Sequence, residues 1–123
     1  MIKMLIVDDE AGICKILKQI FDEVGFEVTT TTNPRDSLSL VAEKKPQIVL
    51  LDILMPGLSG LEVLKQIKDK NKNIKVIMLT TASEEEVKEK ATQLGADYFI
   101  KKPFSENFLK EVIIEKIKEL LGS

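Results

Sequence analysis

The stretch that decides the fold is Ile48-Val49-Leu50-Leu51-Asp52, which continues as Ile53-Leu54-Met55-Pro56-Gly57. Four consecutive apolar residues are typical of a strand that is buried on both faces. A carboxylate at the end of such a strand must leave the core, because an isolated buried carboxylate is costly or becomes neutral. Pro56, Gly57 and Gly60 then predict a turn into a helix, with positive φ available to the glycines. Asp52 is therefore either a residue that caps this turn or a functional residue.

Composition limits what the rest of the chain can be. The 123 residues are 44% apolar and 31% charged, which suits one compact domain with one core. We expect that domain to cover residues 1–123 and to leave no room for an output domain. The formal net charge of −2 argues against a general nucleic-acid surface, which would normally show a basic excess.

Several kinds of chemistry are excluded by missing residue types. The chain contains one cysteine, Cys14, and no histidine. It therefore lacks an internal disulfide, a Cys/His zinc site, a histidine-dependent nucleophile and a histidine of its own to phosphorylate. No apolar run approaches the ~20 residues that cross a bilayer. The amino-terminal segment also reaches Asp8 too soon for a signal peptide, so we expect a cytoplasmic protein without membrane contact.

Strand-like and helix-like stretches alternate five times along the chain. The helical stretches show apolar residues at three-and-four spacing. Ser83, with Glu86 three residues later, predicts a capping box, and Asn33 and Ser105 are further predicted caps. Gly25 and Gly95 are predicted to end helices. This alternation predicts an α/β fold in which a parallel sheet is covered on both sides. The expected strands are residues 4–7, 26–31, 48–51, 74–79 and 97–100, with helices over 11–24, after Asn33-Pro34, after Gly60, between 83 and 95, and after Ser105.

Polar residues gather where these strands end. In an open parallel sheet, ligands bind beyond the carboxyl ends of the strands. Close carboxylates need a cation or raised pKa values, and oxygen ligands without His or Cys suit Mg²⁺. A neighbouring ammonium and hydroxyl would make a pocket for a phosphoryl group, which an Asp carboxylate can accept as an acyl phosphate. The residues at these ends are Asp8, Asp9, Asp52, Thr80 and Lys102.

Five short motifs, in order, resemble the response-regulator receiver family of CheY-like proteins over essentially the whole chain. The resemblance implies a doubly wound, five-stranded parallel (βα)5 fold of strand order 2-1-3-4-5, the order given for this family. It also implies a receiver of the stand-alone, single-domain type. The motifs are Val7-Asp8-Asp9-Glu10, Leu51-Asp52 with Met55-Pro56-Gly57, Leu79-Thr80, Gly95-Ala96-Asp97 and Lys102-Pro103-Phe104.

The resemblance implies a role for each residue of a metal and phosphoryl site. Asp52 would be the phosphoacceptor. Asp9 would bind Mg²⁺ directly and Asp8 mainly through water, while Asp52 and the backbone carbonyl of Leu54 would complete the protein ligands. Thr80 would bond one phosphoryl oxygen and move on activation.

The resemblance also implies a switch around the last strand. Lys102 would pair with a phosphoryl oxygen, and the Lys102-Pro103 bond would be cis. Phe99 stands at the family's aromatic switch position, where the ring turns inward when Thr80 shifts. Thr81 stands where a small alanine is frequent, so the space for that turn is expected to be tighter.

Leu54 and Ala82 lie two residues beyond Asp52 and Thr80, at variable family positions that border the path of the attacking water. Both are apolar and neither can orient that water. We therefore expect slow loss of the phosphoryl group.

The function implied by the resemblance is two-component signal transduction. A sensor histidine kinase or a histidine phosphotransfer protein would supply the phosphoryl group to Asp52 in a Mg²⁺-dependent reaction. The modified domain would then act by binding an unidentified protein target, or by dimerising on phosphorylation. The chain itself would be a phosphoacceptor that catalyses its own phosphorylation and dephosphorylation.

Two other functions stay open. A haloacid-dehalogenase-type phosphatase also uses an Asp nucleophile and magnesium, but it wants a second Asp where this chain has Leu54, and it usually carries a cap insertion. A pseudo-receiver would bind its partner constitutively, although every acceptor-site residue is present. Gly12, Ile13, Ile16 and Ile20 lie beside the acidic pocket, on the helix that docks on the kinase in receivers, so exposure of part of this set is one alternative. Core packing is the stronger expectation for Ile16 and Ile20. For Ile114 and Leu121 we consider a wide buried face, or contact with a partner or with a second copy.

Overall fold

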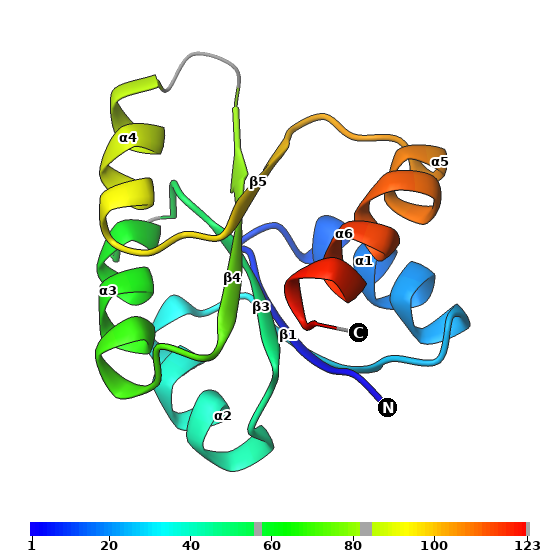
Figure 1. Ribbon diagram of the computed structural model, residues 1–123, viewed down its shortest axis with the longest axis horizontal. Coiled ribbons are helices and arrows are strands. Elements are labelled where there is room, and N and C mark those ends of the chain that lie inside the picture. The colour runs from blue at the N-terminus through cyan, green and yellow to red at the C-terminus, as the bar shows by residue number, and fades with distance from the viewer. Residues whose placement is uncertain (56–57, 82–84, 123) are drawn as a thin grey trace.

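One five-stranded parallel sheet organises the molecule. The computed structural model describes residues 1–55, 58–81 and 85–122. The strands pair in parallel in the order β2-β1-β3-β4-β5. Figure 1 labels β1, β3, β4 and β5 of this sheet. The predicted order is therefore confirmed, with the β-branched second strand at one edge. The strands are β1 (Lys3–Val7), β2 (Glu27–Thr31), β3 (Ile48–Asp52), β4 (Lys75–Thr80) and β5 (Tyr98–Lys101).

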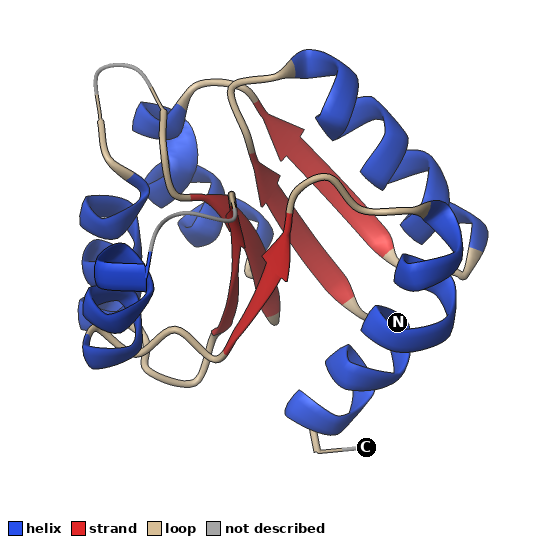
Figure 2. Ribbon diagram, turned by 90° about the horizontal axis from the view of Figure 1, so that it is seen from above, coloured by secondary structure: helices blue, strands red, loops and turns tan. Residues whose placement is uncertain are grey.

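Helices cover both faces of this sheet, which gives the three layers visible in Figures 1 and 2. One face carries α1 (Ala11–Glu23) and the carboxyl-terminal helical run, and the other carries α2 (Ser37–Lys44), α3 (Gly60–Lys70) and α4 (Glu85–Gln93). A short 3-10 turn, η1 (Pro34–Asp36), precedes α2. The sheet divides the buried apolar residues into two clusters, one beneath each helical layer. No helix within the described ranges has both the length and the apolar character needed to traverse a bilayer.

The central strand is buried along its whole length, as the sequence predicts. Residues 48–51 are all inaccessible to solvent, and Asp52 at the strand end is 6% exposed. Gly60 begins the following helix, but it has no positive φ. A Cβ at this position would instead collide with the backbone oxygen of Asp52 and lie 2.7 Å from the Cα of Ile53. Gly60 is therefore required for the close approach of α3 to the end of β3.

Several helix ends follow the predicted chemistry. Gly25 and Gly95 adopt positive φ just after α1 and α4. The Asn33 side chain accepts a hydrogen bond from the Arg35 N–H, and the Ser105 hydroxyl accepts one from the Phe108 N–H. These caps satisfy backbone donors that would otherwise lack partners. The capping box predicted at Ser83 lies outside the described residues.

The carboxyl-terminal helical run departs from a regular helix. It comprises α5 (Glu106–Phe108), η2 (Leu109–Ile113) and α6 (Ile114–Leu120), and η2 is π-helical. The Ile114 N–H donates to the Leu109 carbonyl five residues back. This wide turn allows Ile113 and Ile114 to be buried together, and Leu121 packs against the same core cluster. The wide buried face is therefore the correct alternative for Ile114.

Helix α1 differs from the sequence expectation at one position. Ile20 is buried as predicted, but Ile16 is 54% exposed, so its expected core role is wrong. Cys14 is buried on the same helix, with 4% of its surface exposed. The helix therefore turns a small thiol toward the sheet where the periodicity favoured a larger isoleucine.

Candidate functional site

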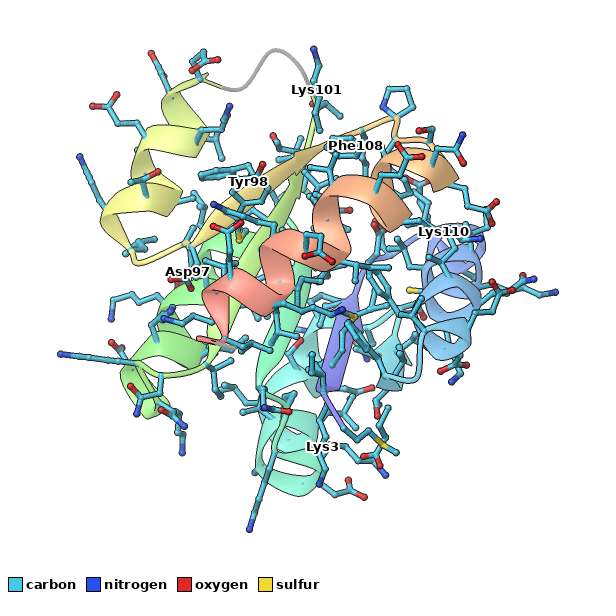
Figure 3. The ribbon with its side chains drawn as sticks, turned by 45° about the vertical axis from the view of Figure 1, so that its right-hand side comes forward. Lys3, Asp97, Tyr98, Lys101, Phe108 and Lys110 are labelled. Atoms are coloured by element: carbon cyan, nitrogen blue, oxygen red, sulfur yellow. The ribbon has the colours of Figure 1, made fainter. Side chains whose placement is uncertain are left out.

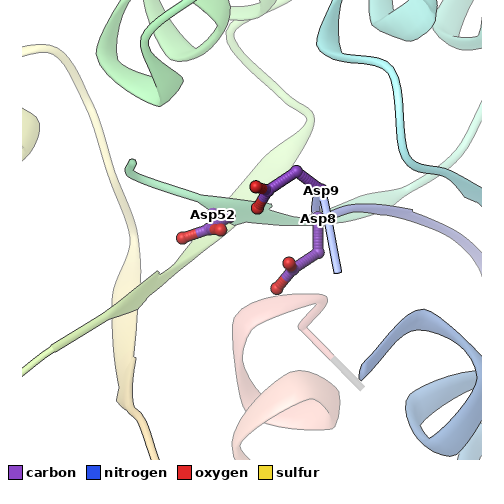
Figure 4. A group of neighbouring side chains, drawn as sticks. All are labelled: Asp8, Asp9 and Asp52. Atoms are coloured by element: carbon purple, nitrogen blue, oxygen red, sulfur yellow. The ribbon is translucent and has the colours of Figure 1, made fainter. Parts of the chain in front are cut away.

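Three carboxylates meet at the carboxyl ends of two neighbouring strands. Asp8 and Asp9 directly follow β1, and Asp52 ends β3, which pairs with β1. One oxygen of each of the three side chains lies within 4.8 Å of the other two, and Figure 4 shows them converging. Asp8 is fully buried, whereas Asp9 is exposed. The predicted acidic cluster is therefore present, with one open side.

Lys102, which follows β5, places its ammonium against this cluster. Its Nζ lies 2.8 Å from Asp8 Oδ2, 3.3 Å from Asp52 Oδ2 and 3.6 Å from Glu10 Oε1. The Lys102 side chain is only 12% exposed. Because Asp8 and Asp52 are also buried, these two interactions are screened less than a surface ion pair. The structure thus brings the predicted lysine into the site.

Burial and charge shift the proton affinities of the central pair. Burial, reinforced by the negative charge of Asp8, raises the pKa of Asp52 to about 7, although Lys102 acts in the opposite direction. Burial alone would lower the pKa of Lys102, but its contacts with Asp8 and Asp52 outweigh burial and raise it. The site therefore holds a firmly charged ammonium beside a carboxylate that exchanges its proton near neutral pH.

Thr80 and Phe99 lie on the neighbouring strands. Asp52 is in register with Leu79, so Thr80 is the next residue along β4. Thr80 is 4% exposed, and its hydroxyl donates to the Thr81 carbonyl at 3.1 Å. Thr80, Thr81 and Phe99 line a pocket of about 160 Å³, and the Lys88 ammonium lies 5.4 Å from the centre of the Phe99 ring. A hydroxyl and an aromatic ring thus share one small space beside the cluster.

The remaining predicted positions are placed as follows. Leu54 follows Asp52 by two residues, and its side chain is 60% exposed. The Lys102-Pro103 peptide bond is cis, which confirms the expectation drawn from the resemblance. Ala82, Pro56 and Gly57 lie outside the described residues.

Two neighbours of the site received no role from the sequence. Glu10 contacts Lys102, and its backbone N–H donates to Asp8 Oδ1 at 2.9 Å. The Cys14 thiol lies 3.3 Å from the Asp8 carbonyl. Burial, together with the charge of Asp8, raises the pKa of this thiol, so it supports the loop as a neutral group. In the sequence, only the closeness of Glu10 and Cys14 to Asp8 could have indicated a role for them. The contacts themselves are visible only in the fold.

A groove of about 440 Å³ runs from the site along α1. Its walls combine the charged groups of Glu10 and Lys102 with apolar side chains, among them the exposed Ile16. An apolar groove beside the acidic cluster offers a partner a contact surface next to the site. The other lining residues are Ile13, Thr81, Pro103 and Phe104.

Comparison with known families decides the assignment. The family model for the response regulator receiver domain matches residues 4–114. The chain belongs to this family. It is thus a receiver domain of two-component signal transduction, and its function is to accept a phosphoryl group.

Sequence relatives extend this receiver assignment. Sporulation initiation phosphotransferase F of Bacillus subtilis is 34% identical over 111 residues, which cover 90% of each chain. Response regulator SaeR of Staphylococcus epidermidis is 43% identical over 105 residues. That match covers 85% of this receiver but 45% of the relative. The chain therefore spans nearly all of one relative and less than half of the other.

Solved structures give the same fold for the receiver. A CheY-like receiver domain protein from Methanospirillum hungatei superposes with a TM-score of 0.89 at 31% identity, over 98% of this chain and 96% of the other. Chemotaxis protein CheY4 of Vibrio cholerae gives a TM-score of 0.88 at 27% identity, over 98% and 99%. The predicted fold class is therefore confirmed.

Proposed function

We propose that residues 1–123 form one receiver domain in which Asp52 is the phosphoacceptor. The observation that carries this assignment is the placement of its carboxylate, at the end of the fully buried β3 and in contact with the Lys102 ammonium. Other carboxylates of the site fit less well. Asp8 is fully buried, and it is held by Lys102 and by the Glu10 N–H.

The residues at the site fit a magnesium ion. The donor set consists of oxygens alone, from three clustered carboxylates, and Mg²⁺ favours oxygen ligands and retains several waters. We propose Asp9, Asp52 and the Leu54 carbonyl as direct ligands and Asp8 as a ligand through water. When bound, the ion would supply positive charge that offsets the phosphoryl oxygens and the repulsion among the carboxylates.

The side chains account for the transfer itself. An oxygen of ionised Asp52 forms a bond to phosphorus while the phosphorus–nitrogen bond of the donor phosphohistidine breaks, and the ring nitrogen retains the electron pair. The Lys102 ammonium then pairs with a phosphoryl oxygen, and the Thr80 hydroxyl donates to another. This self-catalysed acceptance, with slow hydrolytic loss, requires no further catalytic residue from the chain.

The proposed phosphodonor is a histidine kinase or a histidine phosphotransfer protein that docks over α1. Ile13, Ile16 and Phe104 provide the apolar part of the adjoining groove. The phosphorylated surface would then bind a protein target or a second receiver. We also propose a cytoplasmic location, since the single cysteine, Cys14, is buried and unpaired and carries no disulfide of the kind found in oxidising compartments.

The test is incubation with phosphoramidate and Mg²⁺, followed by measurement of the intact mass. We expect one phosphoryl adduct in the wild type and in the control Asp69→Asn, which changes an exposed carboxylate outside the site. Asp52→Asn should carry none. An adduct that persists in Asp52→Asn would contradict the assignment of the acceptor.

The same experiment separates the two alternatives. Continuous release of phosphate from simple phosphate esters would indicate a phosphatase. Absence of any adduct, with folding intact, would indicate a pseudo-receiver. Removal of Mg²⁺ with EDTA should abolish the adduct, and its persistence in EDTA would contradict the proposed metal requirement.

A further inference from the structure

The end of the molecule opposite the phosphoryl site carries a concentration of lysines. We define the basal patch as Lys3, Lys45, Lys70, Lys72 and Lys75. Lys3 begins β1 and Lys75 begins β4, the strands on either side of β3, and their backbones are both hydrogen-bonded to Gln47. Figure 3 labels Lys3 at this end, far from Lys101 near the phosphoryl site.

Two hollows of this surface each include one lysine of the patch. One, of about 360 Å³, is lined by Lys45 together with the amide side chains of Gln47, Asn71 and Asn73. The other, of about 380 Å³, lies between α3 and α4, where Lys65, Lys68 and Lys72 outnumber the single carboxylate, Asp69. The patch thus combines ammonium groups with neutral amide donors around concave surface, an arrangement suited to carboxylate groups.

Helix termini explain only part of this charge. Lys70 lies in the last turn of α3, where a cation complements the helix dipole. Lys72 and Lys75 lie beyond that turn. Among the described residues, no carboxylate is within ion-pair distance of Lys70, Lys72 or Lys75. These three charges are therefore available to a partner.

Lys45 provides an independent observation. It follows α2 in the left-handed conformation, with φ of 51° and ψ of 57°. At the equivalent positions after α1 and α4 the chain uses Gly25 and Gly95. A non-glycine residue in this region carries a steric cost. Lys45 nevertheless occupies it, and it lines the first hollow together with Gln47 and Asn71.

We propose that the basal patch docks an acidic segment of a partner protein, independently of phosphoryl transfer. The positive charge of the patch favours an acidic partner. The residue types of the patch, lysines and amides, favour a protein over a nucleic acid. The only arginine of the chain, Arg35, lies outside the patch, and none of the described aromatic residues lines either hollow. Nucleic-acid surfaces favour arginine forks and aromatic stacking.

The binding experiment uses fluorescein-labelled octaglutamate and fluorescence anisotropy at physiological salt. The test variant is K70Q/K72Q/K75Q. The matched control is K15Q/K110Q/K118Q, which removes the same charge from exposed positions on α1 and the carboxyl-terminal helices. We expect about tenfold weaker binding in the test variant and less than about twofold change in the control. Phosphorylation by phosphoramidate should be equal in all three proteins.

Other outcomes would overturn the proposal. Equal loss of affinity in both variants would show attraction by net charge alone. Tighter binding of a single-stranded oligonucleotide of the same charge would assign the patch to nucleic acid. Absence of octaglutamate binding, or amide chemical-shift changes centred on α1 instead of residues 45–47 and 70–75, would also refute it. A wild-type dimer in sedimentation that is lost in K70Q/K72Q/K75Q would assign the patch to a second copy of this chain.

Discussion

Replacement of Asp52 by asparagine should stabilise the metal-free receiver in a pH-dependent way. The Asp52 side chain is 9% exposed, and its pKa is raised from 3.8 to about 7. A carboxyl whose pKa is raised by folding is held better when protonated. The folded state therefore loses stability as pH rises from about 4 to about 7, and above that range it bears the whole cost of the buried charge.

The size of the pKa shift of Asp52 sets the expected gain in stability of Asp52→Asn. About three pKa units at 1.36 kcal/mol each correspond to roughly 4 kcal/mol at pH 8. At pH 5, where the folded carboxyl is still protonated, the cost is roughly 1–2 kcal/mol. An asparagine side chain has a similar shape and no charge, so Asp52→Asn should remove both costs. Lys102 would lose one partner but keep Asp8 at 2.8 Å, which makes these values upper limits.

The assay is urea unfolding, followed by circular dichroism in EDTA at pH 5 and pH 8. The stability gain of Asp52→Asn over the wild type should increase by about 2–3 kcal/mol between these pH values. The control Asp69→Asn, which breaks an exposed pair with Lys65, should change stability by less than about 1 kcal/mol at both. Excess Mg²⁺ should stabilise the wild type preferentially and narrow the gap. A gain that is independent of pH, or a loss at pH 8, would refute the reasoning.

Three further predictions concern stability and phosphoryl lifetime. Lys68→Met should lower the free energy of unfolding in urea by about 2–4 kcal/mol. The Lys68 ammonium lies 2.9 Å from the half-buried Asp97 and 2.7 Å from the Ile74 carbonyl, and both partners would lose it. A loss no larger than that of Lys65→Met would contradict this prediction. Gly60→Ala should lower the free energy of unfolding by more than about 2 kcal/mol, since the new Cβ meets the backbone at the end of β3. An unchanged urea midpoint would show that α3 can move away freely. Leu54→Asn should hasten loss of the phosphoryl group, because the exposed Leu54 offers the attacking water no polar group. The loss is measured over time by intact mass. A fast loss in the wild type that Leu54→Asn leaves unchanged would overturn this expectation.

The layered fold could be predicted from sequence because its signals are local. An apolar run such as residues 48–51 needs burial on both faces, and glycine at Gly25 or Gly95 marks a helix end. The position of Asp52 followed from the same logic, because a carboxylate at the end of a buried strand must emerge where neighbouring strands also end. Strand order came from the family resemblance, since the alternation of elements alone permits several orders.

What escaped the sequence depends on distances between segments. The periodicity on α1 could not show that Cys14 faces the sheet while Ile16 faces the solvent-exposed groove. The contact of Glu10 with Lys102 joins residues far apart in the chain, so no local pattern reports it. The reason for Gly60 was also hidden, because close backbone approach and positive φ both select glycine. Sequence patterns could identify which residues matter, but only tertiary packing shows what each of them contacts.

The π-helical turn at Leu109–Ile113 sets the rotational phase of the last helical segment. Each residue of an α-helix advances by about 100° around the axis, so one inserted residue would turn everything after it by that amount if the helix stayed regular. A wide turn absorbs the inserted residue and leaves the later residues facing as before. Ile114 and Ile117, which follow the turn, are 6% and 0% exposed. A homologue one residue shorter here would therefore wind as an uninterrupted helix and close the same core with the same apolar residues in its final turns.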